Sequence, residues 1–301
     1  KLNIAEHRLP QDGRMKLKMG PKEIDVRVSI LPTVHGEKAV LRLLGSGDKE
    51  LNLSNLGFPS NKLVTFKKWI NQPYGMIIIS GPTGSGKSTT LYAALQQIKS
   101  DSINITTVED PVEYQIPGIN QIQVHEAIGL TFSNALRSIL RQDPDVLLIG
   151  EIRDQETADI AVKFSMTGHL VFSTVHANDA PSTISRLLDL GIPPFLLGSS
   201  LNLIMAQRLV RTIDPNEKEE DKPSKDELDR LGISENAANS MKFFKGNPTQ
   251  QNHNTGYKGR TAIHEILEIN SSIREMIFEE KSESEIRSQA IKNGMTPLRS
   301  A

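Results

Sequence analysis

The octapeptide from Gly81 to Ser88 constrains this chain more than any other stretch, because it fits G-x-x-x-x-G-K-[ST] at every fixed position. An apolar run at residues 76–80 precedes it and a helical pattern at 87–99 follows it. In such a strand, loop and helix, the glycines let the backbone wrap around phosphates, so that N–H groups and the helix N-terminus face the anion. The nucleotide-binding residues predicted from this motif are Gly81, Pro82, Thr83, Gly84, Ser85, Gly86, Lys87, Ser88 and Thr89. Lys87 is expected to reach the β- and γ-phosphates, and the Ser88 hydroxyl to bind Mg²⁺.

Strand and helix patterns alternate around this loop. Short apolar strands separated by helices predict an α/β fold with a mostly parallel sheet covered on both faces. Thr131 is a candidate helix cap. The predicted strands lie at 76–80, 104–108, 146–149 and 170–173, and the predicted helices at 62–72, 87–99, 131–141 and 157–166.

The flanking regions differ from this core. Residues 1–44 are β-rich, with alternating strands at 24–30 and 38–43 and a break at 45–48. Residues 214–230 carry eight acidic and four basic residues and two prolines, which suggests a solvated, mobile insertion, and 246–254 is also loop-like. An apolar stretch at 261–267 and short helices at 273–278 and 285–292 follow. The predicted division is a small α+β domain at 1–48, a linker at 49–60, the core at 61–210, an insertion at 211–260 and a mostly helical, truncated C-terminal region at 261–301.

Composition excludes several function classes. The 301 residues include 35 Lys and Arg, 36 Asp and Glu and no Cys, so the net charge is −1 and disulfides, thiolate zinc sites, iron–sulfur clusters and Cys nucleophiles are ruled out. Aromatic residues make up 5% and no basic–aromatic stripe is present, so we expect no nucleic-acid partner. No apolar run approaches the ~18 residues of a membrane span. The chain reads as an internal fragment of a cytoplasmic protein, cut at both ends.

Acidic residues follow two of the predicted strands, where ligand sites of α/β sheets lie. Glu151 follows the strand at 146–149 and fits a second Mg²⁺-side role, although an exposed loop acid is the plain alternative. Glu109 and Glu113 follow the strand at 104–108 and are candidates for polarising a water molecule. A merely solvated acidic loop is equally compatible with that second pattern.

Histidines and arginines give weaker signals. His169 and His176 flank the strand at 170–173, where either a phosphate- or water-contacting role or a structural role is open. Arg27 and Arg42 lie on different strands of the small domain. Arginine binds phosphate oxygens through its planar fork, but two arginines on strands are otherwise ordinary surface residues.

Four motif blocks, at 81–88, 106–114, 141–154 and 167–178, occur in this order. With them the chain resembles, over residues 8–298, the secretion ATPases that power type II secretion and type IV pilus assembly. The resemblance implies a RecA-like core, a homo-hexamer and a small preceding domain that closes over ATP. It also implies that Arg27 and Arg42 reach the phosphates, that Glu151 serves Mg²⁺, and that Glu113 activates water with Glu109 in reserve.

One departure from the family is plain. Assembly-type members usually carry four cysteines that bind zinc before a Gly-Tyr-x-Gly-Arg segment, which here is residues 256–260. The expected cysteine places hold residues such as Asp214 and Glu217, and His253 alone cannot make a tetrahedral site. We expect no zinc and a module held by packing or left partly disordered.

By this resemblance, the chain is a cytoplasmic ATPase motor that drives an inner-membrane platform protein, with cytoplasmic docking proteins as further partners and contact with the membrane through these partners alone. A pilus retraction ATPase is the closest alternative. A nucleotide-dependent switch or docking protein with negligible turnover is the alternative from another class, and a nucleic-acid motor is the third.

Overall fold

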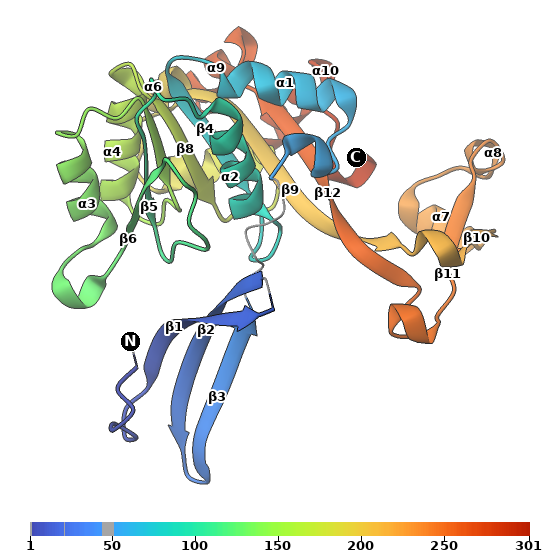
Figure 1. Cartoon of the computed structure of the whole chain (residues 1–301). Coiled ribbons are helices and arrows are strands. Elements are labelled where there is room, and N and C mark those ends of the chain that lie inside the picture. Colours follow the sequence, from blue (N-terminus) through green and yellow to red (C-terminus); the bar gives the residue numbers. More distant parts are fainter. Residues whose placement is uncertain (1, 21, 44–50) are drawn as a thin grey trace.

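A computed structural model describes residues 2–20, 22–43 and 51–301 (Figure 1). The strands form a three-stranded sheet near the N-terminus, a seven-stranded sheet in the core and a two-stranded sheet in the insertion. The break predicted at 45–48 lies outside the described residues.

The three-stranded sheet, called here the N-terminal sheet, is an antiparallel meander of β1 (Gln11–Met19), β2 (Lys22–Thr33) and β3 (Gly36–Leu43). The strands predicted at 24–30 and 38–43 lie within β2 and β3, whereas β1 was not predicted. Successive side chains of a strand point to opposite faces, so buried Val26 and Val28 share one face while Arg27 points to the other. Residues 2–20 and 22–43 contain strands but no helix.

The core sheet has the strand order β12-β9-β4-β8-β7-β5-β6. All neighbouring pairs are parallel except β12 and β9, which are antiparallel. Every residue of β4, β5, β7 and β8 is buried, as expected for central parallel strands that are covered on both faces. The strands are β4 (Gly75–Ser80), β5 (Ile105–Glu109), β6 (Asn120–Gln123), β7 (Val146–Ile149), β8 (Leu170–Val175), β9 (Leu201–Ile213) and β12 (Tyr257–Glu268).

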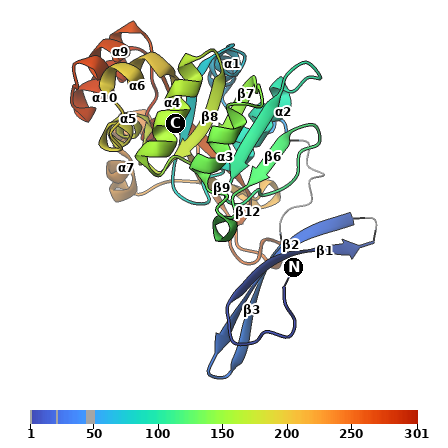
Figure 2. The ribbon, with the colours of Figure 1, turned by 90° about the vertical axis from the view of Figure 1, so that its left-hand side faces the viewer.

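Helices cover both faces of this sheet. Figure 2 shows α1 and α2 on one side and α4, α5, α6, α9 and α10 on the other, and the buried apolar residues accordingly form two clusters. Thr131 caps α3 by accepting a hydrogen bond from the Asn134 N–H at 3.3 Å, as predicted. The core helices are α1 (Ser60–Ile70), α2 (Lys87–Ile98), α3 (Phe132–Ile139), α4 (Gln155–Met166), α5 (Ala180–Asp189), α6 (Pro194–Ser200), α9 (Ser271–Phe278) and α10 (Glu283–Lys292). Single 3-10 turns are η1 (Leu53–Asn55), η2 (Glu126–Ile128), η3 (Pro215–Glu217), η4 (Gln250–Asn252) and η5 (Leu298–Ser300).

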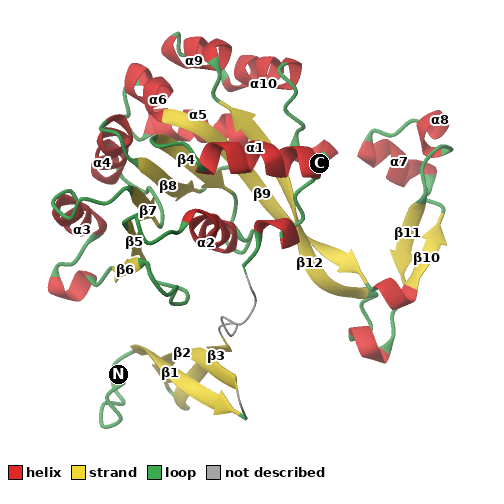
Figure 3. Ribbon diagram, turned by 45° about the horizontal axis from the view of Figure 1, so that its top comes forward, coloured by secondary structure: helices red, strands yellow, loops and turns green. Residues whose placement is uncertain are grey.

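The insertion extends from the core at the end of a two-stranded ribbon formed by β9 and β12 (Figure 3). It contains β10 (Lys218–Asp221), α7 (Lys225–Leu231), α8 (Glu235–Ala238) and β11 (Phe243–Gly246), with β10 and β11 antiparallel. We expected residues 214–230 to be a mobile insertion, but they form regular elements because local signals specify them. Ser224 and Glu227 make a reciprocal capping box at α7.

The strand pairing also bears on the boundaries that we predicted. The stretch at 261–267, assigned to the C-terminal region, lies in β12 and pairs with β9 as an edge strand of the core sheet. Strand β6 and helices α5 and α6 were not predicted either. No helix among the described residues is both long and apolar enough to cross a membrane.

Candidate active site

A cleft of about 620 Å³ opens where the carboxyl ends of β4, β5, β7 and β8 meet. Parallel strands end at the same edge of a sheet, so loops far apart in the sequence meet there. Most of the predicted site residues line this cleft. From the predicted set these are Thr83, Gly84, Ser85, Gly86, Lys87, Ser88, Thr89, Glu109, Glu113, Glu151, His176 and Arg42.

The glycine-rich loop requires its glycines. Gly81 and Gly86 have φ of 149° and 88°, a region that favours glycine. A Cβ at Gly81 would lie 2.6 Å from the Gln207 carbonyl oxygen, and one at Gly86 would lie 2.8 Å from Gln207 Nε2. A Cβ at Gly84 would meet nothing within 4 Å, which leaves this part of the loop open for a close-fitting ligand.

Gln207 lies midway along β9, directly after the residues that pair with β4, and contacts the glycine-rich loop from the core side. It is 1% exposed, its Nε2 donates to the Ser85 carbonyl at 2.8 Å, and its Oε1 accepts from the Thr90 hydroxyl at 2.8 Å. The sequence reasoning missed this residue. A single amide that follows the apolar run Leu203–Ala206 was the signal that could have found it.

Lys87 is the first residue of α2, and its side chain turns back toward the start of the glycine-rich loop. Its Nζ donates to the carbonyl oxygens of Gly81 at 2.9 Å and Pro82 at 3.1 Å. Burial lowers the pKa of Lys87, and the Glu151 carboxylate opposes that shift. Ser88 and Thr89, in the first turn of the same helix, are exposed in the cleft. The Ser85 hydroxyl is buried and makes no hydrogen bond within the described part of the chain. A cationic amine and hydroxyls at a helix N-terminus suit a polyphosphate.

Glu151 lies just beyond β7, with a side chain that is 14% exposed. Its carboxylate pairs with the Arg153 guanidinium, and its Oε2 lies 3.8 Å from His176 Nε2. Burial, reinforced by the Lys87 ammonium, holds the pKa of His176 below its ordinary value of 6.5. The imidazole is therefore neutral at neutral pH, so Arg153 is the charge partner of Glu151.

Glu109, the last residue of β5, and Glu113, in the loop beyond it, occupy different surroundings. Glu109 is 5% exposed, accepts hydrogen bonds from the Tyr92 and Thr107 hydroxyls and from Gln121 Nε2, and burial raises its pKa. Glu113 is half-buried in the cleft wall, and its main-chain N–H donates to the Tyr92 hydroxyl at 3.2 Å. Its carboxylate makes no hydrogen bond with another described residue, so of these two acids it is the one that remains available to a ligand in the cleft.

Four predicted residues do not line the cleft: Gly81 and Pro82, which begin the glycine-rich loop, and His169 and Arg27. His169 lies at the opposite end of β8, where its Nδ1 is 3.2 Å from both the Phe164 carbonyl oxygen and the Thr167 hydroxyl. At ~3.3 Å per residue, the length of β8 separates this ring from the cleft, so its surroundings favour the structural role left open above. Arg27 lies beside Arg42 in β2, one strand further from the cleft edge. Besides Gln207, the sequence reasoning missed Arg153 and Arg260, which line the cleft.

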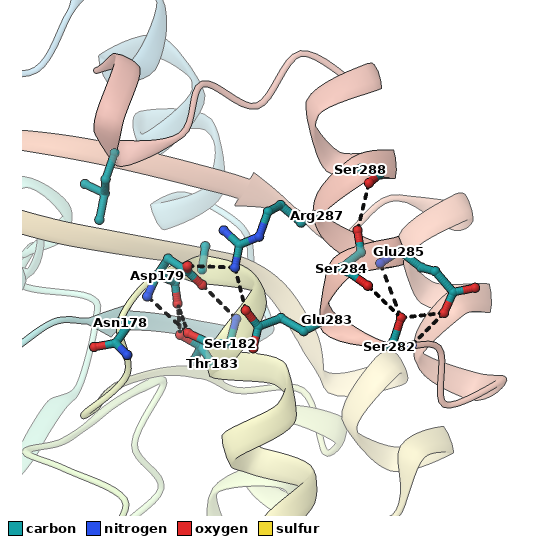
Figure 4. Close-up of polar contacts among 12 residues, drawn as sticks. Asn178, Asp179, Ser182, Thr183, Ser282, Glu283, Ser284, Glu285, Arg287 and Ser288 are labelled. Carbon is teal, nitrogen blue, oxygen red and sulfur yellow. Dashed lines mark hydrogen bonds and ion pairs between the residues drawn. The ribbon is translucent and has the colours of Figure 1, made fainter. Parts of the chain in front are cut away.

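The segment that leaves the cleft after His176 is tied to the C-terminal helices (Figure 4). Asp179 caps α5 by accepting from the Ser182 N–H at 2.9 Å, and its Oδ2 pairs with Arg287 of α10 at 2.8 Å. Arg208 also donates to the Asn178 carbonyl. The segment that follows His176 in the cleft wall is therefore joined to α10 by the ion pair between Asp179 and Arg287.

The sequence matches the family described as "Type II/IV secretion system protein" over residues 1–301. The chain belongs to this family. The secretion-family resemblance given by the four motif blocks is confirmed.

Individual relatives support the same assignment. This secretion-family chain is 49% identical over 300 residues to the type IV pilus assembly ATPase PilB of Myxococcus xanthus, with 99% of the chain and 53% of the relative covered. It is 49% identical over 298 residues to the type II secretion system protein E of Xanthomonas campestris, with the same two coverages. The chain thus spans about half the length of these curated relatives.

Among solved structures, the chain is similar to the pilus retraction motor PilT with bound ADP, with a TM-score of 0.69 and 28% identity over 95% of this chain and 75% of that one. The ATPase DotB of Legionella pneumophila shares the fold, with a TM-score of 0.64 and 23% identity over 95% of this chain and 69% of that one. These neighbours confirm the predicted α/β class with a mostly parallel sheet.

Proposed function

We propose that this secretion-family chain binds ATP with Mg²⁺ in the cleft and hydrolyses the terminal phosphoanhydride bond. One observation carries the proposal: a single cleft gathers the glycine-rich loop, carboxylates delivered by β5 and β7, and Arg42 of a separate sheet. Phosphoryl transfer is catalysed mainly by positioning and by charge stabilisation, and these residue types supply both.

The phosphates are held by the loop and the start of α2. Main-chain N–H groups of residues 84–89 face the anion, and Lys87 leaves its carbonyl partners to reach the β- and γ-phosphates. Burial lowers the pKa of Lys87, and two phosphates at its ammonium would reverse that shift by favouring the charged form.

Magnesium fits this donor set. No group of three or more His, Asp or Glu side chains suited to a metal occurs among the described residues, but Mg²⁺ takes most of its ligands from phosphates and water. The Ser88 hydroxyl and the Glu151 carboxylate are the two protein oxygens that would hold it. When bound, it neutralises charge on the phosphates. Arg153, paired with Glu151, would hold that carboxylate in place beside the metal.

Glu113 takes the proton of the attacking water. Glu109, whose oxygens accept bonds from Tyr92, Thr107 and Gln121, instead supports the loop from within the core. Arg42 and Arg27 stabilise the negative charge that develops on the transferred phosphoryl group. His176 remains neutral beside Glu151 and contacts phosphate or water in the cleft.

We further propose that hydrolysis drives a motor. ATP would bridge the glycine-rich loop and the N-terminal sheet, so product release would free the sheet to move against the core. The names of the relatives suggest type IV pilus assembly or type II secretion as the process. A homo-hexamer acting in the cytoplasm on an inner-membrane platform protein and its docking proteins is the assembly we propose, with no zinc in the insertion.

A retraction motor is the second candidate, because the PilT structure shares this fold. The identity of 49% to an assembly ATPase, against 28% to the retraction motor, favours assembly. A switch protein that binds ATP without turnover is the candidate from another class.

Steady-state phosphate release from the full-length oligomeric protein tests the proposal. We expect Glu113→Gln to lower kcat by about a hundredfold, within the range of general-base catalysis. The matched control is Glu275→Gln, because Glu275 is exposed on α9 and its carboxylate makes no hydrogen bond or ion pair with a described residue. If wild type and Glu113→Gln release phosphate equally slowly, the switch protein replaces the motor.

A further inference from the structure

Three arginines form a row across the N-terminal sheet. Arg14 of β1 pairs in register with Arg27 of β2, and Arg27 pairs with Arg42 of β3. Directly opposed residues of antiparallel strands lie on one face with Cβ atoms ~4.5–5.5 Å apart, where like charges repel. No ion pair within residues 2–20, 22–43 and 51–301 joins any of the three to a described carboxylate. The row is therefore built to meet something outside the sheet.

The two ends of the row meet different partners on the core. Arg42 lines the cleft beside the glycine-rich loop. Arg14 instead donates from Nη2 to the main-chain carbonyl of Val112, which directly precedes Glu113. The arginine-bearing face thus spans from the phosphate site to the loop that carries the proposed base.

That loop is also held from the core side. The Tyr92 hydroxyl accepts from the Glu113 N–H at 3.2 Å, and Gln121 Nε2 donates to the Tyr114 carbonyl at 3.2 Å. Arg14 is the contact that reaches the same loop from the N-terminal sheet. Loss of the Arg14 contact would leave the loop attached to the core but unrestrained on the side of the sheet.

We propose that Arg14 is a positioning residue that makes the placement of Glu113 depend on the seating of the N-terminal sheet. Arg27 and Arg42 stabilise charge on the nucleotide, whereas Arg14 donates a hydrogen bond to the main chain of the loop that carries Glu113. When the sheet leaves the core, Arg14 releases Val112 and the base loses its alignment with the attacking water. This inference rests on the proposed function and adds to it a device that blocks hydrolysis while the cleft is open.

The acceptor chemistry supplies a sharp test. A single carbonyl oxygen accepts from a lysine ammonium as well as from a guanidinium, whereas bidentate phosphate clamping requires arginine. We expect Arg14→Met to lower kcat about tenfold, the equivalent of one lost hydrogen bond, with little change in KM for ATP. Arg14→Lys should restore kcat to within about threefold of wild type, because its ammonium still donates to the carbonyl.

The matched control is Lys18→Met. Lys18 lies further along β1 on the same face and is exposed, and its ammonium makes no hydrogen bond or ion pair with another described residue. Melting temperature and oligomer size, compared across the three variants, separate misfolding from misplacement of the base. The inference is overturned if Arg14→Met keeps the kcat of Lys18→Met, if the loss falls on KM, or if Arg14→Lys is as defective as Arg14→Met.

Hydrogen exchange provides a readout that does not need turnover. In protein bound to a non-hydrolysable ATP analogue, the amides of residues 112–114 should exchange faster in Arg14→Met than in Arg14→Lys or wild type, because the loop opens more often. Equal exchange in wild type, Arg14→Met and Arg14→Lys would refute the proposal that Arg14 restrains the loop. If wild type releases no phosphate but this exchange difference is present, the proposed ATPase activity is refuted, whereas the restraint of the loop by Arg14 is retained.

Discussion

His264 is a buried base whose removal should change how stability depends on pH. It lies in β12, is 1% exposed and stacks on Phe58 with 3.8 Å between ring centroids and 7° between planes. Neither ring nitrogen makes a hydrogen bond within the described part of the chain. Burial, with the Lys62 ammonium nearby, lowers the pKa of His264 from 6.5 to about 4.

The sign of the effect follows from this lowered pKa. The unfolded chain takes up a proton as the pH falls through 6.5, whereas the folded protein resists it until about 4. The stability that the neutral His264 contributes is therefore present above pH 6.5 and is lost as the pH falls. Linkage gives a loss in the free energy of unfolding of about 2 kcal/mol by pH 5 and about 3 kcal/mol by pH 4.

His264→Phe keeps the stacking on Phe58 and removes the titration. We expect the free energy of unfolding of the variant, minus that of wild type, to rise by about 2 kcal/mol between pH 7 and pH 5. Urea unfolding followed by fluorescence measures this, because the single tryptophan, Trp69, donates its indole N–H to Glu268 of β12 at 2.7 Å. His35→Phe, in the exposed turn between β2 and β3, is the control and should match wild type at each pH. A constant difference between His264→Phe and wild type from pH 7 to 5 would refute the reasoning.

Two further variants test how the cleft is held. Gln207→Ala removes the hydrogen bonds to Ser85 and Thr90 and leaves a space behind the glycine-rich loop. Affinity for a non-hydrolysable ATP analogue, measured by titration calorimetry, should therefore fall about tenfold. Unchanged affinity would mean that the loop keeps its conformation without Gln207. Arg287→Met breaks the half-buried pair with Asp179, whose pKa the pair and the capping bonds lower, and should cost about 1–2 kcal/mol of unfolding free energy at pH 7. The difference between Arg287→Met and wild type should shrink as the pH falls below 3.8, and an unchanged difference there would contradict the assignment.

The parts of the fold that local patterns specify were predictable. The strand at 146–149 has the predicted bounds because four apolar residues lie between polar neighbours. Glu109, Glu113 and Glu151 could be assigned to one site because the carboxyl ends of parallel strands meet at one edge of a sheet.

Contacts between distant segments were not predictable. Strand β12 joins the core sheet by pairing with β9, across an insertion whose acidic composition resembles that of a separate, solvated module. The partner of Arg14 is the main-chain carbonyl of a residue 98 positions away. Every residue has such a carbonyl, so the residue type at position 112 could not have indicated this contact. The two roles left open for His169 could not be separated from the sequence, because proximity in sequence to a strand does not tell at which end of that strand the cleft lies.

Under the proposed function, the arginine row would let the nucleotide itself control the seating of the N-terminal sheet. Arg14, Arg27 and Arg42 stand in adjacent register positions, and repulsion between neighbouring charges near a protein surface is on the order of 1 kcal/mol per pair. Under the proposed function, phosphates in the cleft would supply the opposite charge to Arg42, which lines it, and to Arg27 in the neighbouring strand, so the ligand would stabilise the seated arrangement. Under the proposed function, loss of the γ-phosphate removes part of that charge and restores the repulsion. The same event that completes hydrolysis then weakens the seat of the sheet and, through Arg14, the placement of Glu113.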